Sequence, residues 1–287
     1  MAACPKLVIV TGAARGLGVG ICRQVLRQDA ECELLVAARR LDAAQPHVVC
    51  LGKRARAVEC DVSSEDSCQR LAQLVAQVRA GRSLVVVHNA GVAFDLPWFP
   101  APWPAEAAAA TLDVNFFGAR RLTEALLPEL LDPEAPGRLV FVSSGAAAAN
   151  LKKVSEVRRE QLLSSDFAGL ETIANDFIRE YEMAAKEQKE EKLLPWLSDS
   201  GFWLQSYGFS KVCLNRYCRL LARRHPSLTC VACSPGFVET DMVKSYAGDS
   251  KLRSVDEGGD VCGWLAWSPE VRGCSYYNPD RSVDPAF

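Results

Sequence analysis

Histidine and long apolar runs are both scarce in this sequence. Among 287 residues there are three histidines, His47, His88 and His225, which lie far apart in the sequence. Because protein metal sites commonly draw on histidine, a histidine-based metal site is not expected. No stretch approaches the ~20 apolar residues that a membrane span requires, and the N-terminus lacks the long apolar segment of a signal peptide. We therefore expect a cytoplasmic protein with no metal and no membrane partner.

The sequence also lacks an excess of charge of either sign. Lysine and arginine number 33, aspartate and glutamate number 35, and the net charge is −2. Binding to nucleic acid draws on a basic surface that neutralises phosphates, and this composition offers none. No nucleic-acid partner is expected, and a small-molecule partner fits better.

Cysteine, by contrast, is frequent, with twelve residues scattered through apolar segments. Disulfide frameworks are typical of short secreted chains, whereas a chain of this length buries roughly three quarters of its unfolded surface without them. Cys230 and Cys233 have the spacing of a redox motif. They lie inside the apolar run 228–234, where alternation places them on opposite faces of a strand. We expect buried free thiols.

Apolar segments of strand length alternate with amphipathic segments along the chain. Strands are expected near residues 6–11, 33–38, 56–60, 84–88, 138–143, 228–233 and 274–277, with helices between them. This order predicts a doubly wound, parallel, seven-stranded α/β sheet of the Rossmann type, with helices on both faces. Because no linker-like break interrupts the pattern, residues 1–287 are expected to form a single domain.

Residues 145–205 interrupt this alternation. The segment 176–194 is highly charged, and Phe177, Ile178, Tyr181 and the pair 183–184 supply only a partial apolar stripe. The pattern predicts a helical insertion with one or two surface helices. The charged run 186–192 is interpreted as a solvated face rather than a docking site.

Tyr207 and Lys211 are four residues apart, a spacing that places both side chains on one face of a helix. A tyrosine has a pKa of about 10, and a nearby ammonium favours the phenolate, which would bring the hydroxyl closer to acid–base use at neutral pH. The pair also arises by chance on solvated helices. Its interpretation as a proton donor and its activator therefore depends on the rest of the sequence.

A glycine-rich turn near the N-terminus supplies that context. The apolar segment 6–10 leads directly into Thr11-Gly12-Ala13-Ala14-Arg15-Gly16-Leu17-Gly18, and a helical pattern follows over 19–26. Glycines permit a tight turn and close approach of the backbone, so that a pyrophosphate can bind at the helix N-terminus. The position of the turn after the first strand indicates a dinucleotide site.

With these residues the chain resembles the short-chain dehydrogenases/reductases, from Lys6 to about Tyr277. The matching motifs, in order, are the turn 11–18, Asp61-Val62, Asn89-Ala90-Gly91, Asn115 within 114–118, Ser143-Ser144, the Tyr207/Lys211 pair and the segment 234–242. The long stretch between Ser144 and Tyr207 most resembles the monomeric NADPH-dependent carbonyl reductases. One departure is His88, where asparagine commonly precedes the Asn-Ala-Gly motif, and it is expected to change hydrogen bonds at the strand end only.

The resemblance implies a catalytic role for four residues. Tyr207 would donate a proton to the oxygen that gains negative charge as a hydride reaches a carbonyl carbon. Lys211 would lower the pKa of Tyr207 and hold the nicotinamide ribose hydroxyls. Ser144, rather than Ser143, would hydrogen-bond the carbonyl oxygen, and Asn115 would hold a helix irregularity and a water that relays protons to Lys211.

The cofactor is expected to be NADPH/NADP+. The second strand ends in Arg39 and Arg40 and has no acid at its end, so a 2′-phosphate would meet the cationic fork of Arg39 and not a carboxylate. Arg15 would clamp the same phosphate, although Asp42 lies close by. Asp61 would bind the adenine amino group or, alternatively, cap a helix. The other cofactor-binding residues expected are Thr11, Gly12, Gly16, Leu17, Gly18, Val62, Asn89, Ala90, Gly91, Pro235, Gly236, Val238 and Thr240, with Tyr207 and Lys211.

The function implied is NADPH-dependent reduction of a ketone, aldehyde or quinone. Two alternatives stay open: an NADP-dependent alcohol dehydrogenase of steroid or terpenoid type, and a non-catalytic NADP(H)-binding regulator, which would have lost one of the four catalytic residues. Apolar residues suggested for the substrate pocket are Phe94, Trp98, Trp103, Trp203 and Met242.

A monomer is expected because the insertion would cover a surface that typical relatives use to associate. In those relatives the helices that carry Asn115 and the Tyr/Lys pair pack against symmetry mates. Here Ser144 and Tyr207 are 63 positions apart, and the apolar residues of the insertion would close over the substrate cleft. These residues are Trp196, Leu197, Phe202 and Trp203.

Overall fold

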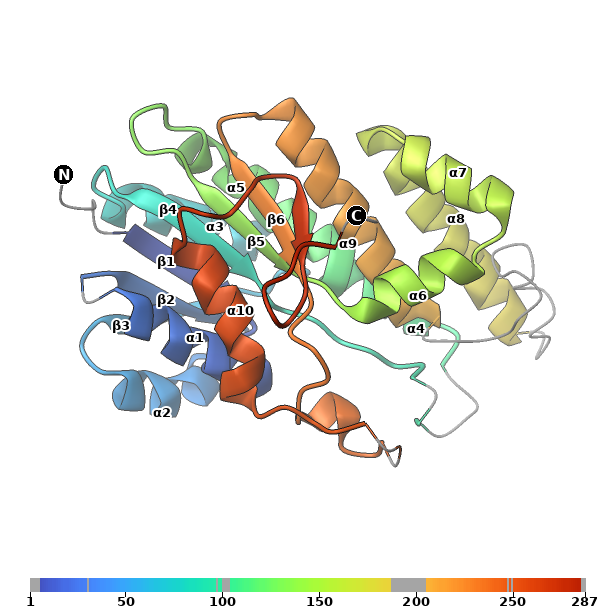
Figure 1. Cartoon of the computed structure of the whole chain (residues 1–287), viewed down its shortest axis with the longest axis horizontal. Coiled ribbons are helices and arrows are strands. Elements are labelled where there is room, and N and C mark those ends of the chain that lie inside the picture. The colour runs from blue at the N-terminus through green and yellow to red at the C-terminus, as the bar shows by residue number, and fades with distance from the viewer. Residues whose placement is uncertain are drawn as a thin grey trace.

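The computed structural model of the chain describes residues 6–29, 31–96, 98–99, 104–186, 205–246, 248 and 250–284. Seven parallel strands form one sheet in the order β3-β2-β1-β4-β5-β6-β7 (Figure 1). The strands are β1 Lys6–Thr11, β2 Glu33–Ala38, β3 Ala55–Glu59, β4 Ser83–His88, β5 Arg138–Val142, β6 Thr229–Cys233 and β7 Ser275–Tyr277. The expected strands are all present, and the doubly wound α/β fold is confirmed.

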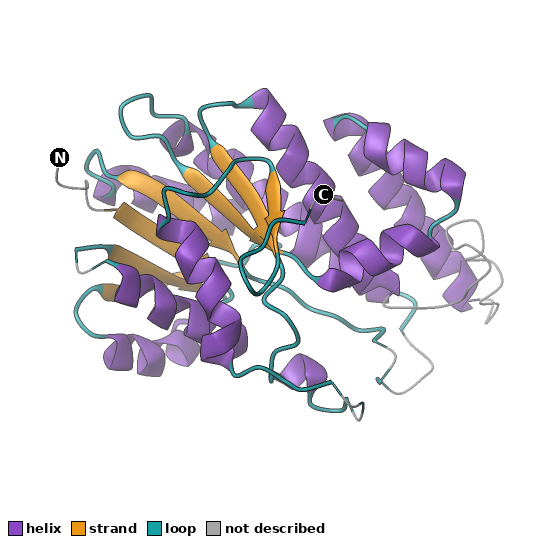
Figure 2. Ribbon diagram, in the orientation of Figure 1, coloured by secondary structure: helices purple, strands orange, loops and turns teal. Residues whose placement is uncertain are grey.

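Helices cover both faces of this sheet (Figure 2). Helices α1, α2 and α10 contribute to the core on one face, and α3, α4, α5, α8 and α9 contribute to the core on the other. The described helices are α1 Gly16–Gln28, α2 Leu41–Leu51, α3 Glu65–Val78, α4 Ala107–Leu112, the π-helical η1 Asp113–Gly118, α5 Ala119–Leu130, α6 Gly145–Lys153, α7 Glu156–Ser164, α8 Phe167–Lys186, α9 Gln205–Arg224, the 3-10 turn η3 Asp241–Val243 and α10 Val255–Trp267.

Strand β1 explains the layering. Leu7 and Ile9 belong to the core on one face, whereas Val8 and Val10 belong to the core on the other, and all four are fully buried. Successive side chains of a strand point to opposite faces, so a continuous apolar run requires cover on both sides. The strand order reverses between β1 and β4, and ligands of such sheets bind beyond the carboxyl ends of the strands at that point.

Between β5 and α9 the described chain forms the three helices α6, α7 and α8. Helix α8 buries Phe177, Tyr181 and Ala184, whereas Met183 is 52% exposed, so the apolar stripe is narrower than expected at that position. The ring of Phe177 stacks on Phe209 of α9 at a centroid distance of 4.0 Å. Most of the charged run 186–192 lies outside the described residues, as do Trp196, Leu197, Phe202 and Trp203.

The described cysteines are free thiols, and most are buried. Cys230 and Cys233 belong to the cores on opposite faces of the sheet, as alternation on β6 predicts. Within the described ranges, His, Cys, Asp and Glu side chains form no group of three suited to a metal ion. None of the described helices is both long enough and apolar enough to cross a membrane.

Candidate active site

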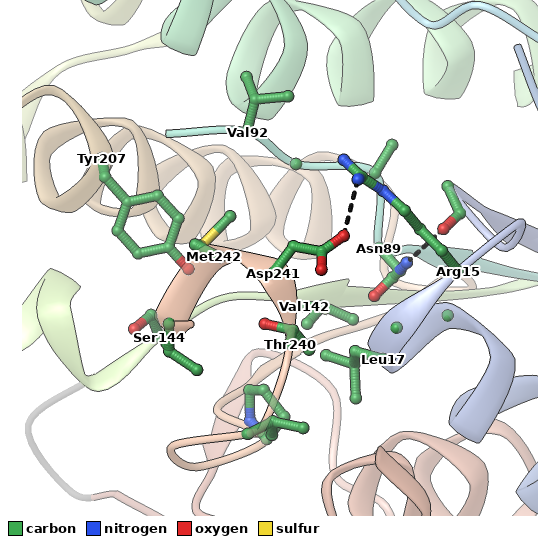
Figure 3. A pocket seen from close by; sticks show the side chains of 18 of the residues that line it. Arg15, Leu17, Asn89, Val92, Val142, Ser144, Tyr207, Thr240, Asp241 and Met242 are labelled. Carbon is green, nitrogen blue, oxygen red and sulfur yellow. Dashed lines mark hydrogen bonds and ion pairs between the residues drawn. The ribbon is translucent and has the colours of Figure 1, made fainter. Parts of the chain in front are cut away.

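A cleft of about 760 Å³ lies where the loops at the carboxyl ends of the strands meet. Figure 3 shows Tyr207 and Ser144 on one side of it, and Arg15, Leu17 and Asn89 on the other. Thr11 and Asn115 do not line the cleft but hold residues that do. The expected residues that line it are Gly12, Arg15, Gly16, Leu17, Gly18, Arg39, Asp61, Val62, Asn89, Ala90, Gly91, Ser144, Tyr207, Lys211, Pro235, Gly236, Val238 and Thr240.

The glycine-rich turn is tied to the end of β4. The Thr11 hydroxyl accepts hydrogen bonds from the backbone N–H groups of Asn89 and Ala90, both at 3.0 Å. Gly12 has a φ of +63°, and a Cβ built on it would lie 2.8 Å from the Cα of Ala90, so no larger residue fits there. No side chain caps the N-terminus of α1, whose first amides therefore stay available to an anion.

Three arginines occupy the end of the cleft beyond β2, and two of them have acidic partners. Arg15 forms an exposed ion pair with Asp241 at 2.9 Å, and Arg40 pairs with Asp42. Arg39 is exposed at the end of β2 and forms no ion pair or hydrogen bond with any residue that the structure describes. The neighbouring acid Asp42 is thus engaged by Arg40, and Arg39 is free to bind an anionic ligand.

Asp61 follows β3 and lines the cleft. Its carboxylate accepts hydrogen bonds from the backbone N–H of Ser63 at 3.0 Å and from the Ser63 hydroxyl at 2.6 Å. The capping role belongs to Ser64, whose hydroxyl accepts from the N–H of Ser67 at the start of α3. The alternative interpretation of Asp61 as the helix cap is therefore wrong.

Helix α9 brings Tyr207 and Lys211 to the opposite end of the cleft. The Lys211 ammonium is buried, lies 5.5 Å from the centroid of the Tyr207 ring and donates a 2.8 Å hydrogen bond to the carbonyl of Val142. Burial lowers the pKa of Lys211 to about 8, against a smaller opposing effect of Cys233. Desolvation thus weakens the hold of this lysine on its proton relative to an exposed lysine.

The pKa of Tyr207 differs from the sequence-based expectation. Burial raises it, and a hydrogen bond with Ser144 opposes the rise. Lys211 was expected to lower this pKa, yet its ammonium is directed to the Val142 carbonyl and the net direction is upward. Desolvation, which spacing along a helix does not report, therefore determines the direction of the Tyr207 pKa, and the opposing effect comes from Ser144.

The two serines after β5 have different surroundings. Ser143 is 1% exposed, and its hydroxyl has no hydrogen-bond partner among the described residues. Ser144 caps the N-terminus of α6, where its hydroxyl accepts from the N–H of Ala146 at 3.1 Å, and it also hydrogen-bonds Tyr207. The geometry therefore favours Ser144 as the partner of the tyrosine.

Asn115 lies in the π-helical turn η1 and is 1% exposed. Its side-chain oxygen accepts from the N–H of Val92 at 2.8 Å, while its amide donates to the Val92 carbonyl at 2.9 Å and to the Ser210 hydroxyl at 3.0 Å. The Ser210 hydroxyl in turn donates to the carbonyl of Tyr207 at 2.7 Å. Asn115 thus joins the loop after β4 to α9, and the expected helix irregularity is present.

The substrate end of the cleft is apolar where the structure describes it. Trp98 and Met242 line it as expected, with Val92 and Leu96, whereas Phe94 is 41% exposed and does not line it. The Trp98 indole donates to the carbonyl of Met242 at 2.9 Å. Trp103 and Trp203 lie outside the described residues.

Two aromatic residues that sequence reasoning missed, Phe237 and Tyr246, line the same end beside Trp98. Trp98 packs edge-on against Phe237 and Tyr246, with centroid distances of 5.9 and 5.2 Å, and so connects the loops after β4 and β6. Trp98 is more than 130 positions from either of the other two rings, so no local pattern could indicate the contact. His88 is equally a packing residue: it stacks on Phe141 and shares a 3.0 Å hydrogen bond with Thr123.

Comparison with known proteins agrees with this geometry. The profile of the short chain dehydrogenase family matches residues 6–156, more than half of the chain. The chain belongs to the short-chain dehydrogenase/reductase family. It is accordingly an oxidoreductase that uses NAD(P) and acts on small molecules, and the expected resemblance is confirmed.

Two curated members of this family resemble nearly the whole chain. Carbonyl reductase (NADPH) 3 of Homo sapiens is 30% identical, with 94% of this chain and 93% of the relative covered. Carbonyl reductase (NADPH) 1 of Mus musculus is 28% identical, with 99% of this chain and all of the relative covered. Among solved structures, salutaridine reductase from Papaver somniferum superposes with a TM-score of 0.77 at 23% identity, covering 95% of this chain and 99% of that one, which bears on the fold alone.

Proposed function

We propose that this short-chain dehydrogenase/reductase is an NADPH-dependent carbonyl reductase that transfers a hydride to a ketone, an aldehyde or a quinone. The observation that carries the proposal is the placement of functional residues at the two ends of one cleft. Ser144, Tyr207 and Lys211 lie at its apolar end, and Arg39, which has no partner among the described residues, lies at the end beyond β2. The NADPH carbonyl reductases among its relatives support the same assignment.

The residues present fit NADPH. The uncapped first turn of α1 and the close approach at Gly12 suit the pyrophosphate, and Arg39 suits a 2′-phosphate because its guanidinium forms a bidentate cationic fork. The Asp61 carboxylate would accept a hydrogen bond from the adenine amino group, and Pro235 and Thr240 would lie beside the nicotinamide. When bound, the cofactor supplies the hydride.

The protein contributes the stabilisation of charge and the proton. As negative charge grows on the carbonyl oxygen, the hydroxyls of Ser144 and Tyr207 donate hydrogen bonds to it, and Tyr207 gives up its proton. Burial holds that proton on Tyr207 at neutral pH, which suits an acid that must be protonated when the hydride arrives. Lys211 stabilises the phenolate that remains, and Asn115 keeps the local helix geometry that a proton relay requires.

The substrate is proposed to be an apolar carbonyl compound. Val92, Leu96, Trp98 and Met242 supply the described wall beyond the hydroxyl pair, and none of them carries a charge. Burial of a flat apolar ligand against such a wall gives affinity, while the two hydroxyls fix the orientation of its oxygen. The same residues serve the reverse oxidation of an alcohol, so an NADP-dependent alcohol dehydrogenase remains the alternative to be tested.

The enzyme is also proposed to be monomeric. Helix α8 packs on α4 and α9, and the ion pair between Arg120 and Glu171, at 2.7 Å, joins it to α5. Obligate interfaces need a large apolar surface, and α8 occupies the surface formed by these helices. Placement in the cytoplasm and organisation of residues 1–287 as one domain with a 145–205 insertion are proposed from the sequence pattern.

The test is an assay of NADPH oxidation with quinones, aromatic aldehydes, aliphatic ketones and ketosteroids, run in parallel with NADP+ and the matching alcohols. Tyr207→Phe is the variant that tests the proton donor, because it removes one hydroxyl and no packing volume. Turnover should fall at least ~10²-fold in this variant while the affinity for NADPH stays nearly constant. Turnover by Tyr207→Phe near the parent rate would contradict the mechanism, and NADPH binding without any turnover by the parent protein would favour the regulator.

A further inference from the structure

A buried carboxylate outside the cleft contacts the catalytic helix at its first turn. Asp95 lies in the loop after β4, is 0% exposed and does not line the cleft. Its Oδ2 accepts a 2.9 Å hydrogen bond from the backbone N–H of Ser206, the second residue of α9 and the neighbour of Tyr207. The N–H groups of a first helical turn have no acceptor within their own helix. Asp95 supplies one from 111 positions away.

The same carboxyl group also contacts the insertion. Tyr181 on α8, itself 3% exposed, interacts with the Asp95 carboxyl group, whose Oδ1 has no hydrogen-bond partner among the described residues. The Ser206 hydroxyl hydrogen-bonds Thr111 of α4 at 3.2 Å, and Thr111 is fully buried. A chain of polar contacts therefore runs from α8 through Asp95 to the start of α9, within an otherwise apolar layer.

A buried carboxyl group is costly unless its hydrogen bonds are satisfied, so its presence here needs an explanation. Burial raises the pKa of Asp95, and hydrogen bonds with Ser206 and Tyr181 oppose the rise. An apolar residue would serve packing alone at lower cost. What a carboxyl group adds is a fixed acceptor for the Ser206 N–H and a polar contact for Tyr181.

We infer that Asp95 is a positioning residue for Tyr207, and that through Asp95 the insertion helix α8 sets the geometry of the first turn of α9. This inference rests on the proposed function, because Tyr207 is taken as the proton donor. Farther along α9, Asn115 and Ser210 fix the Tyr207 carbonyl. Asp95 fixes the N–H of Ser206, the residue before Tyr207, so the backbone around the tyrosine is held from both sides. A displacement of about 1 Å at a reacting group lowers turnover by as much as 10²-fold.

The test compares Asp95→Asn with Asp95→Ala and Asp95→Leu in the full chain. Asparagine retains an acceptor for the Ser206 N–H and offers a donor to the Tyr181 hydroxyl. Alanine and leucine remove both contacts, and leucine nearly conserves the volume, so it serves where alanine prevents folding. Val75→Ala on α3 is the control for loss of stability alone, since Val75 is fully buried on a helix away from α9.

Two measurements are made on each variant. The first is kcat per NADPH-binding site, which we expect to fall about 10- to 100-fold in Asp95→Leu with the KM for NADPH unchanged, and to stay within about threefold of the parent in Asp95→Asn. The second is hydrogen exchange of a peptide covering 205–212, which should be about five- to tenfold faster in Asp95→Leu and unchanged in Val75→Ala. Tyr181→Phe should lower kcat in the parent but have no further effect when combined with Asp95→Leu.

The outcomes separate the two hypotheses. Asp95→Leu with a parental kcat and a parental exchange rate would overturn the inference, as would an Asp95→Asn variant that is as impaired as the leucine variant. If the parent protein reduces no carbonyl compound, the proposed function fails, but the exchange rates still decide whether Asp95 fixes the first turn of α9. If only the melting temperature changes across the Asp95 variants, the residue is structural and the inference is wrong.

Discussion

Cofactor preference should depend on one of two adjacent arginines. Arg39 and Arg40 are both exposed, line the same cleft and follow the same strand. Arg40 is engaged by Asp42, whereas Arg39 has no partner among the residues that the structure describes. We expect Arg39→Ala to weaken NADPH binding and to leave NADH binding nearly unchanged. Arg40→Ala, its matched control, should change neither.

The size of the effect follows from the exposure of the side chain. A charge-assisted pair between an arginine and a phosphate is worth about 1–3 kcal/mol, which corresponds to a ten- to hundredfold change in Kd. Because Arg39 is open to solvent, screening places the expected loss near the lower limit, at about tenfold. The loss should shrink further as the ionic strength rises. Arg39→Asp should go beyond it, because a carboxylate repels the 2′-phosphate and accepts a hydrogen bond from the 2′-OH of NADH.

The assay is fluorescence titration of each variant with NADPH and with NADH at low and high salt. The informative quantity is the ratio of the two dissociation constants, since a general loss of folding changes both alike. Equal losses in Arg39→Ala and Arg40→Ala would refute the distinction between a free and an engaged arginine. A parent protein that binds NADH more tightly than NADPH would refute the assignment of the cofactor.

Three further predictions concern packing, protonation and assembly. A Cβ on Gly208 would lie 3.0 Å from the side-chain amide nitrogen of Asn150 on α6. Gly208→Ala should therefore push α6 and Ser144 away from Tyr207 and lower kcat about tenfold. The control is Gly273→Ala, whose Cβ would meet nothing within 4 Å. Burial lowers the pKa of Lys211 to about 8, below the ordinary lysine value of 10.5, so between these values the unfolded chain binds more protons and stability rises with pH. In Lys211→Met, urea denaturation at pH 8 to 10 should show a smaller rise in stability than in the parent, and an identical rise would contradict the assignment. Light scattering after size exclusion should give a mass near the 31.3 kDa of one chain, and a mass of about 62 kDa, twice that value, would show that α8 leaves the interface free.

The fold could be predicted from the sequence because its signals are local. Most strands are apolar runs such as 6–11, and the order of strands and helices leaves few topologies open. The glycine-rich turn and the four-residue spacing of Tyr207 and Lys211 are equally local, since backbone conformation and helical periodicity determine which groups share a face. The expected roles of Asp61, Asn89 and Ser144 followed instead from the resemblance of the chain to its family.

Other features depend on residues far apart in the chain. The ion pair between Arg15 and Asp241 spans 226 positions, and the contact of Asp95 with Ser206 spans 111. No periodic pattern relates such residues, because their approach results from the packing of whole elements. The engagement of Asp42 by Arg40, which leaves Arg39 free, is a choice between neighbouring rotamers that the order of residues does not specify.

The direction of the Tyr207 pKa shows the same division. The sequence by itself determined the fold class, the strand positions, the dinucleotide turn and the presence of a tyrosine and a lysine on one helical face, because these depend on local conformation and periodicity. Only the tertiary structure decided that burial raises the pKa of Tyr207, that the Lys211 ammonium binds the Val142 carbonyl and that Asp95 meets the first turn of α9. Desolvation and long-range hydrogen bonds are properties of the packed interior, and they arise when distant segments exclude water from the same space.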